Sequence, residues 1–216
     1  MIFIPSKNFL YLRVPKTGST STTHNLLENL DSIEDLQCSQ PENFITVDPI
    51  KINVNLPVHG KISNLIKTGL LKEENVCNLK TFSVIRDPVD RLISVAWDSV
   101  PAEIAEKYTT DYIVEYYFEN YSYDEPQVEF LKYNGQLISN IYAYENLDVM
   151  MKDIANYLNI NYNPIKYRHR SERRKNKLIN LTSTLVNKIY QIYENDLILY
   201  RAVTKNKDKN DKEINQ

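Results

Sequence analysis

Short apolar runs alternate with amphipathic segments along this chain. Phe9–Val14 and Thr81–Ile85 are apolar and rich in β-prone residues, so each predicts a buried strand, and Ile138–Tyr144 predicts a third. Apolar residues at helical spacing follow these strands. The segments that predict helices are 19–29, 62–70, 88–97, 148–158 and 182–193. Because strands alternate with helices, we expect an α/β fold with a central parallel sheet flanked by helices.

The remaining segments are less regular. Residues 31–57 predict a loop-rich excursion, and residues 101–133 predict helices in pieces. From residue 205 to 216, charged residues and Asn replace apolar ones, which predicts a disordered polar tail. No repeat or linker interrupts the part before it, so residues 1–204 are expected to form a single domain.

Composition excludes several classes of function. The chain has 216 residues and a formal net charge of -2, which gives no global attraction to nucleic acid or to an anionic membrane surface. No apolar run approaches the ~20 residues that span a bilayer. The start of the chain has no leader pattern, and we expect a cytoplasmic protein. Two separate cysteines and three scattered histidines predict free thiols and no metal site.

The segment Pro15–Ser21, with the sequence PKTGSTS, links the first strand to the first helix. N–H groups at a helix start lack partners within the helix, and the helix dipole adds partial positive charge there. Gly18 lets the backbone approach an anion closely, and Lys16 adds a full charge. Such a loop suits a phosphate or phosphosulfate. The hydroxyl donors that it can add are Ser19, Thr20 and Ser21.

Two other interpretations of this loop compete. Its hydroxyl residues can serve only as N-caps. Alternatively, the loop can belong to a kinase, whose P-loop has the frame GxxxxGK(S/T) with Lys after the last Gly. Here Lys16 precedes Gly18 by two residues, so the loop is shorter than that frame.

A second polar constellation, RDPVDRLIS, follows the buried strand at 81–85. Arg86 stands where that strand ends, at the edge where open α/β sheets bind ligands, and Ser94 lies two turns into the next helix. A phosphate can be held between the Arg86 guanidinium and the Ser94 hydroxyl. Alternatively, Arg86 pairs locally with Asp87 or Asp90.

Taken together, the two motifs resemble the sulfotransferases that use 3′-phosphoadenosine-5′-phosphosulfate (PAPS), especially the carbohydrate and heparan-type branch. Three further stretches fit in order. They are PQVEFL at 126–131, YENL at 144–147 and IYEND at 192–196. The resemblance covers about residues 9–200 and implies a P-loop NTPase-like three-layer sandwich.

The resemblance also implies roles for particular residues. Lys16, Thr17, Gly18, Ser19, Thr20 and Ser21 would contact the 5′-phosphosulfate, with Lys16 also catalytic. Arg86 and Ser94 would bind the 3′-phosphate, and the basic stretch with Arg168 and Ser171 would supply further donor contacts, unless it is only a solvated basic run. PAPS would be the co-substrate, with no metal.

The acceptor hydroxyl needs a general base, and His is the usual choice near neutral pH. Relatives carry a histidine in an HG-type segment between the two donor motifs, which implies His59, with Lys61 beside it. The register of this chain against that segment is not fixed, so the identity of the base stays open between His59 and its neighbours. Other candidates are His24, His169, Glu125 and Glu129.

We therefore expect sulfuryl transfer to an acceptor hydroxyl, on a carbohydrate. A catalytically silent nucleotide-binding protein and a small-molecule kinase are the alternatives. The acceptor pocket is expected from residues 31–57 and 101–125. The tyrosines at 112–123 can stack on sugar rings or simply pack in the core. The sequence does not predict the oligomeric state.

Overall fold

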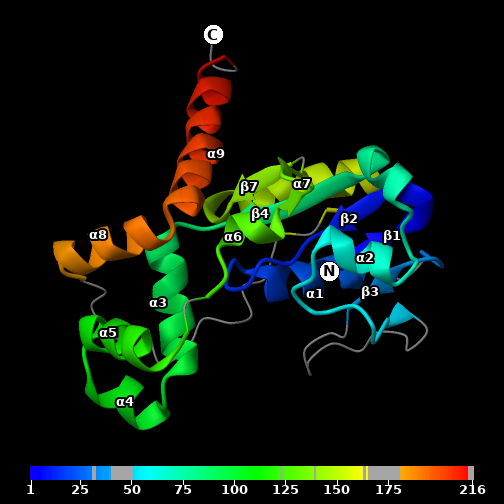
Figure 1. The fold of residues 1–216 in the computed structure, drawn as a ribbon. Coiled ribbons are helices and arrows are strands. Elements are labelled where there is room, and N and C mark those ends of the chain that lie inside the picture. The colour runs from blue at the N-terminus through cyan, green and yellow to red at the C-terminus, as the bar shows by residue number, and fades with distance from the viewer. Residues whose placement is uncertain are drawn as a thin grey trace. The chain divides into compact units, whose positions relative to one another are not determined.

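A computed structural model describes residues 1–30, 33–39, 51–122, 124–138, 140–162, 164 and 181–213, with side chains described through residue 205. The chain divides into two compact units that are each formed from two stretches of sequence. The sheet unit comprises Met1–Ile85 and Gln127–Tyr167, and the helical unit comprises Arg86–Pro126 and Arg168–Gln216. Figure 1 labels their elements. The predicted single domain over 1–204 stays a prediction.

The sheet unit is built on a five-stranded sheet with the order β3-β1-β2-β4-β7. The strands are β1 (Ile2–Ile4), β2 (Phe9–Tyr11), β3 (Gln37–Cys38), β4 (Lys80–Ile85) and β7 (Ile141–Ala143). β2, β4 and β7 are parallel neighbours, as predicted.

The predicted parallel sheet is mixed, because at the other edge β1 pairs antiparallel with both β2 and β3. Only a short 3-10 turn, Pro5–Lys7, and Asn8 join β1 to β2. So short a connection can join antiparallel strands only, because a parallel pair needs a long crossover.

Both faces of this sheet are covered. Alternate strand residues, including Ile4, Phe9 and Val84, pack with α1 (Ser19–Asn29) and α7 (Leu147–Leu158) in one apolar cluster. Phe3, Leu10 and other residues of opposite pleat pack with α2 (Ile62–Lys67) in another. The sheet unit thus has helices in layers on the two faces of a sheet, in agreement with the predicted flanking helices.

Shorter elements complete the sheet unit. They are the 3-10 helices η3 (Glu73–Asn78) and η4 (Tyr144–Asn146), the helix α6 (Gln127–Phe130), and the hairpin of β5 (Lys132–Tyr133) and β6 (Gln136–Leu137). β5 lies at the end of the stretch 101–133, where the sequence predicted helices in pieces, and β6 lies just beyond that stretch. The turn between them contains Asn134 and Gly135, both with positive φ, which suits a tight antiparallel turn.

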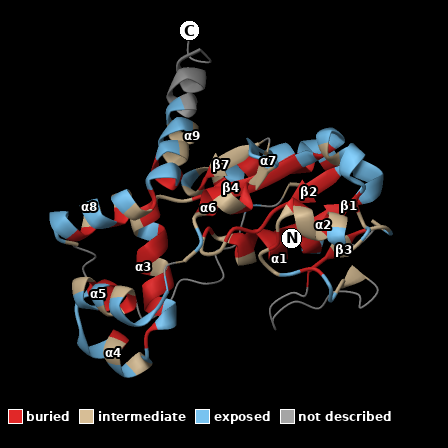
Figure 2. Ribbon diagram, viewed as in Figure 1, coloured by how far each residue is buried: buried red, intermediate tan, exposed pale blue. Residues whose placement is uncertain are grey.

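The helical unit consists of α3 (Pro88–Ser99), α4 (Ala102–Lys107), α5 (Thr110–Asn120), α8 (Ser183–Ile192) and α9 (Glu194–Glu213). Apolar residues of α3, α5 and α8 form its core around the fully buried Trp97. Figure 2 shows the buried side of α3 and the mixed surface of α5. Side chains of Asp87, Thr109 and Thr182 cap α3, α5 and α8, respectively.

The prediction of a disordered polar tail over residues 205–216 stays a prediction. α9 continues to Glu213. Neither Pro nor Gly occurs between Glu194 and that residue, and a helix that is already nucleated adds residues at little cost. Within the described residues, no helix combines the length and the apolar character that a membrane crossing requires.

Candidate active site

The loop between β2 and α1 turns the chain sharply from the sheet into the helix. Leu12 still pairs with β4 through a hydrogen bond from its N–H to the Phe82 carbonyl, 3.0 Å. The backbone then turns with φ of 64° at Lys16 and 75° at Gly18, both left-handed. The first helical bond runs from Thr22 N to Gly18 O, so the N–H groups of residues 19–21 have no acceptor within the helix.

The hydroxyl residues of the loop do not all have the same environment. Thr17 is fully buried, and its hydroxyl donates to the Val14 carbonyl at 2.9 Å. Its side chain therefore holds the turn together, and the predicted contact of Thr17 with the donor stays a prediction. Thr20 accepts a hydrogen bond from the buried Arg13 guanidinium at 3.4 Å. Ser19 and Ser21 are also buried.

Lys16 has an unusual backbone conformation. Among the described residues, every other one with positive φ is Asn or Gly, the types that tolerate the left-handed region. A lysine there costs about 1–2 kcal/mol relative to the right-handed conformation. Lysine is thus not present for its backbone preference, which indicates a functional role for its side chain.

Tyr144 brings the YENL segment onto the loop. A Cβ added at Gly18 would lie 2.9 Å from Cε2 of Tyr144 and 3.2 Å from Cδ1 of Leu147. Two separate constraints therefore require glycine here, namely the left-handed φ and the neighbouring ring. The structure thus joins two motifs that are about 125 residues apart in the sequence.

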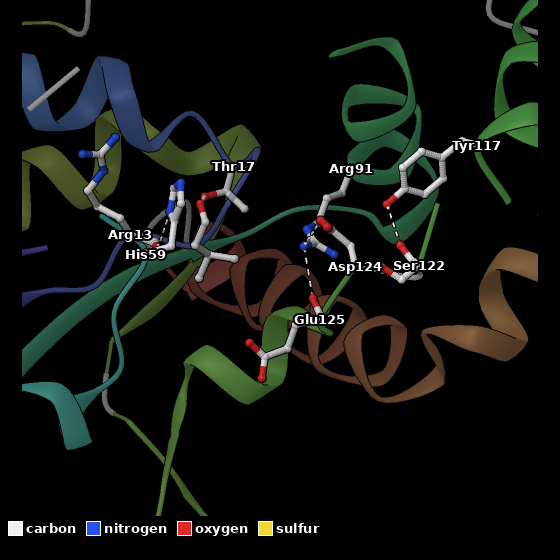
Figure 3. A network of polar contacts seen from close by, with 9 residues as sticks. Arg13, Thr17, His59, Arg91, Tyr117, Ser122, Asp124 and Glu125 are labelled. Atoms are coloured by element: carbon white, nitrogen blue, oxygen red, sulfur yellow. Dashed lines mark hydrogen bonds and ion pairs between the residues drawn. The ribbon is translucent and has the colours of Figure 1, made fainter. Parts of the chain in front are cut away.

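His59 lies beside the residue that leads into the loop. Its Nδ1 is 3.0 Å from the carbonyl oxygen of Arg13, as Figure 3 shows. A carbonyl only accepts, so Nδ1 carries the proton and Nε2 is the basic nitrogen of the neutral ring. Gly60 follows at a buried position where a Cβ would lie 2.9 Å from Cγ of Pro57 and would meet Cε of Met1. The sheet unit therefore holds the predicted His59 and the predicted loop together.

Two of the other candidate bases, His24 and Glu129, are less suited to accept a proton from an acceptor hydroxyl. His24 is only 2 % exposed inside α1, and Glu129 forms an ion pair with Lys132 at 3.2 Å. Lys61 begins α2, where its backbone N–H donates to Asn64 at 2.7 Å, and its ammonium lies 5.5 Å from the ring centre of Phe130. His169 lies outside the described residues, as do Arg168 and Ser171.

In the helical unit, the RDPVDRLIS motif begins α3. Asp87 caps the helix, and its carboxylate accepts hydrogen bonds from the N–H groups of Val89 and Asp90. Asp90 and Ser94 are four residues apart in α3, so they lie along one helix face, whereas Arg86 precedes the N-cap Asp87. The Arg86 guanidinium is 3.9 Å from Asp90, at the long limit for an ion pair. Both the phosphate site and the local pair that the sequence left open therefore remain compatible with this arrangement.

Arg91, in the same motif, has a structural role that the sequence did not reveal. Its guanidinium is 2 % exposed, lies 2.8 Å from the Asp124 carboxylate and donates to the Glu125 carbonyl at 3.1 Å, as Figure 3 shows. Burial raises the pKa of the neighbouring Tyr193 and Tyr117. The sequence feature that could have indicated this role is an arginine at an apolar position of α3, because a buried cation requires an anionic partner.

Tyr190 is a second contact that the sequence did not predict. Its hydroxyl donates to the carboxylate of Asp87 at 3.3 Å, which links α8 to the start of α3. Burial, followed by the Asp87 charge, raises the pKa of Tyr190. The cap that precedes α3 is thus fixed from two elements of the helical unit.

A model of the sulfotransferase family matches residues 1–125, more than half of the chain. The chain belongs to the sulfotransferase family. The matched part contains the loop at 15–21, His59, Arg86 and Ser94, whereas the weaker stretches at 126–131, 144–147 and 192–196 lie beyond it. Neither the curated proteins nor the solved structures gave a significant match. The described residues contain no cluster of His, Cys, Asp and Glu that could hold a metal ion.

The contact between Gly18 and Tyr144 generates a first prediction, for which Gly69 is the matched control. Gly69 has nearly the same φ, 74°, but nothing lies within 4 Å of a Cβ added there. Gly69→Ala should therefore lose only about 1–2 kcal/mol of unfolding free energy. Gly18→Ala should lose a further ~1–3 kcal/mol, because the added methyl also meets the ring.

Urea denaturation of the two variants measures this difference. Adding Tyr144→Ala to the Gly18→Ala variant should remove most of the extra loss. Equal losses for the two glycine variants would show that the ring does not restrict the loop.

Proposed function

We propose that the chain transfers a sulfuryl group from PAPS to an acceptor hydroxyl of a carbohydrate. The observation that carries this proposal is the loop at the start of α1, with Lys16 and left-handed Gly18, beside a histidine whose Nδ1 is held by the Arg13 carbonyl. Membership of the family supports sulfuryl transfer in general. The order of strand, loop and helix supports a P-loop-like arrangement.

The loop has the features that a phosphosulfate requires. The N-cap of α1 is Gly18, and no side chain caps the helix. The N–H groups of residues 19–21 and the positive end of the helix dipole can thus face an anion. Lys16 provides the full positive charge that would balance the charge growing on the leaving oxygen. Bound PAPS supplies the sulfuryl group and the 5′-phosphate oxygen that leaves.

A second site for the 3′-phosphate is proposed at Arg86 and Ser94. β2 and β4 are adjacent and parallel, so β4 ends at Ile85 on the same sheet edge as the loop, and Arg86 is the next residue in the chain. Asp90 would have to give up its long contact with Arg86 when a phosphate binds. That exchange costs little, since the pair is 3.9 Å long and Asp90 is 52 % exposed.

His59 is the proposed general base. With the proton fixed on Nδ1 by the Arg13 carbonyl, Nε2 can take the proton from an acceptor hydroxyl as its oxygen bonds to sulfur. The carbonyl also stabilises the imidazolium that results, because it continues to accept from Nδ1. Positioning and charge neutralisation supply the rest of the catalysis, so the proposal requires no metal.

Lys16 gives the most direct test. Its left-handed backbone is expected to lower the stability of the fold, whereas its side chain is expected to raise the rate of transfer. Lys16→Gly should raise the unfolding free energy by about 1 kcal/mol, because glycine adopts the left-handed φ without strain. The same variant should lower transfer of labelled sulfate from PAPS by roughly 100-fold or more. Lys16→Ala keeps the strain and should show the same loss of transfer.

The alternatives give different results in the same assay. A silent nucleotide-binding protein binds adenosine 3′,5′-bisphosphate but transfers no sulfate to any hydroxyl acceptor. A kinase is stabilised by ATP with magnesium and does not respond to the bisphosphate. Either pattern in the unmodified protein contradicts the proposal.

Arg86 generates a prediction about donor recognition. Arg86→Ala should raise the Kd of adenosine 3′,5′-bisphosphate about tenfold or more, because a charge-assisted contact to the 3′-phosphate is lost. The Kd of adenosine 5′-phosphosulfate, which has no 3′-phosphate, should change little. Calorimetry with both ligands makes the comparison, and Asp90→Asn is the control that keeps Arg86. Equal losses for both ligands would rule out a specific contact with the 3′-phosphate.

His59 generates a prediction about the proton. His59→Ala should lower kcat for sulfate transfer by ~10²–10⁴-fold and leave the Kd of the bisphosphate nearly unchanged. His24→Ala is the control for removing a histidine that is buried in α1. Undiminished turnover of the His59 variant would remove His59 as the base and direct attention to Glu125.

A further inference from the structure

A row of tyrosines lies on the surface of the helical unit. The rings of Tyr108 and Tyr112 stack with centroids 4.1 Å apart, and those of Tyr112 and Tyr116 are 6.3 Å apart and also stacked. Tyr108 is 43 % exposed and Tyr112 is 41 % exposed. Three aromatic rings therefore form a continuous stack at the surface, which we call the tyrosine row.

Tyr116 packs against the apolar cluster of the helical unit, but core packing does not account for Tyr108 and Tyr112. The side of α5 that packs in the core carries Ile113, Val114 and Tyr117, all buried in the apolar cluster of the helical unit. α8 is attached to the same helix through a hydrogen bond from Thr182 N to Asp111 Oδ1, 3.0 Å, and through Lys188, whose ammonium lies 4.6 Å from the ring centre of Phe118. The helix is thus held in place by other residues than Tyr108 and Tyr112. Grouped exposed aromatic rings of this kind mark a binding surface.

Carboxylates accompany the row. Tyr112, Glu115, Tyr116 and Glu119 stand at helix positions i, i+3, i+4 and i+7, so they share one face of α5. Glu115 and Glu119 are exposed, and neither forms an ion pair with any described residue. From residue 101 to 125 the sequence has seven acidic residues and one lysine. This face of α5 therefore combines aromatic rings with two exposed carboxylates.

We propose that the tyrosine row, with Glu115 and Glu119, binds the carbohydrate acceptor, and that this acceptor is a glycan without anionic groups. The inference rests on the proposed function. A sugar ring offers an apolar C–H face, which suits the negative face of an aromatic ring, and hydroxyl groups along its edge, which donate to carboxylates. A polyanionic glycan would instead meet like charge at every carboxylate of this surface.

The chemistry of the row narrows the acceptor further. In a stack of rings, the inner rings expose only their edges, and a ring at the end of the stack exposes one face. A ligand ring can therefore extend the stack at its end. A neutral oligosaccharide can stack on the ring face and donate hydrogen bonds to both carboxylates at the same time. The sulfated or uronate-rich chains that the heparan-type branch would suggest satisfy only the ring face.

The experiment compares sulfate transfer to neutral oligosaccharides, of cello-, malto- and chito-type, with transfer to heparin and polygalacturonate. We expect transfer to neutral chains. Tyr112→Ala should raise the KM for the neutral acceptor about tenfold, which corresponds to loss of one stacking contact of ~1.4 kcal/mol. The KM for PAPS should stay unchanged. Glu115→Gln, a nearly isosteric change on the exposed face, should also raise only the acceptor KM.

Tyr121→Ala is the matched control. Tyr121 is a tyrosine at the end of the same helix with 38 % exposure, but its ring stacks on Tyr117 and its hydroxyl donates to the Ser99 carbonyl. Its replacement should leave the acceptor KM unchanged. A preference for the polyanions, or an unchanged acceptor KM in both Tyr112→Ala and Glu115→Gln, would overturn the inference while sulfate transfer itself stands.

Saturation-transfer NMR with the neutral oligosaccharides and no donor separates the two proposals. Binding that is lost in Tyr112→Ala and kept in Tyr121→Ala supports the tyrosine row even where no sulfate is transferred, in which case only the proposed reaction fails. Absence of glycan binding together with sulfate transfer to a simple phenol overturns the tyrosine row and the carbohydrate acceptor, and leaves sulfuryl transfer from PAPS in place.

Discussion

The left-handed turn at Lys16 and Gly18 is the constraint on which the rest of the sheet unit depends. It points the first N–H groups of α1 at one place at the sheet edge, and it stores strain at a lysine. Three contacts hold it from different sides. The Thr17 hydroxyl closes the turn onto Val14, the Tyr144 ring packs over Gly18, and His59 fixes the carbonyl of Arg13 just before the loop. A strained turn persists only when its surroundings determine it in this way, and here they also include the proposed base.

The second motif divides its residues between structure and chemistry. Asp87 caps α3 and receives the Tyr190 hydroxyl, while Arg91 is buried against Asp124. These contacts fix the start of the helix. Arg86, just before the helix, and Ser94, within it, are left partly exposed, and Asp90 lies near Arg86. A motif of this form therefore predicts a phosphate site for two of its residues only. The others are there because a helix start needs a cap and a buried cation needs an anion.

Local sequence patterns predicted most helices and strands. They did not predict features that depend on contacts between residues far apart in the sequence. The helix at 19–29 and the one beginning at Pro88 followed from spacing and caps, and both occur with those starts. The antiparallel β1 was missed because a three-residue strand carries little periodic signal and its pairing depends on the turn at Pro5–Lys7. The sequence placed Thr17 among the donor contacts, but nothing local indicated that its hydroxyl bonds Val14. The contacts of Tyr144 with Gly18 and of His59 with Arg13 join residues 46 or more positions apart, so no periodicity could predict them.

The near-zero net charge conceals two opposite local environments. The start of α1 is positive through Lys16 and the helix dipole, although the whole chain carries a charge of -2. Residues 101–125 are strongly acidic. Beyond about 8–10 Å at physiological salt such charges are screened, so each ligand responds mainly to the groups nearest to it. An anionic donor and a neutral acceptor can therefore be recognised by one protein without a global field that favours either. Because the anion site is local, the net charge of the whole chain could not indicate it.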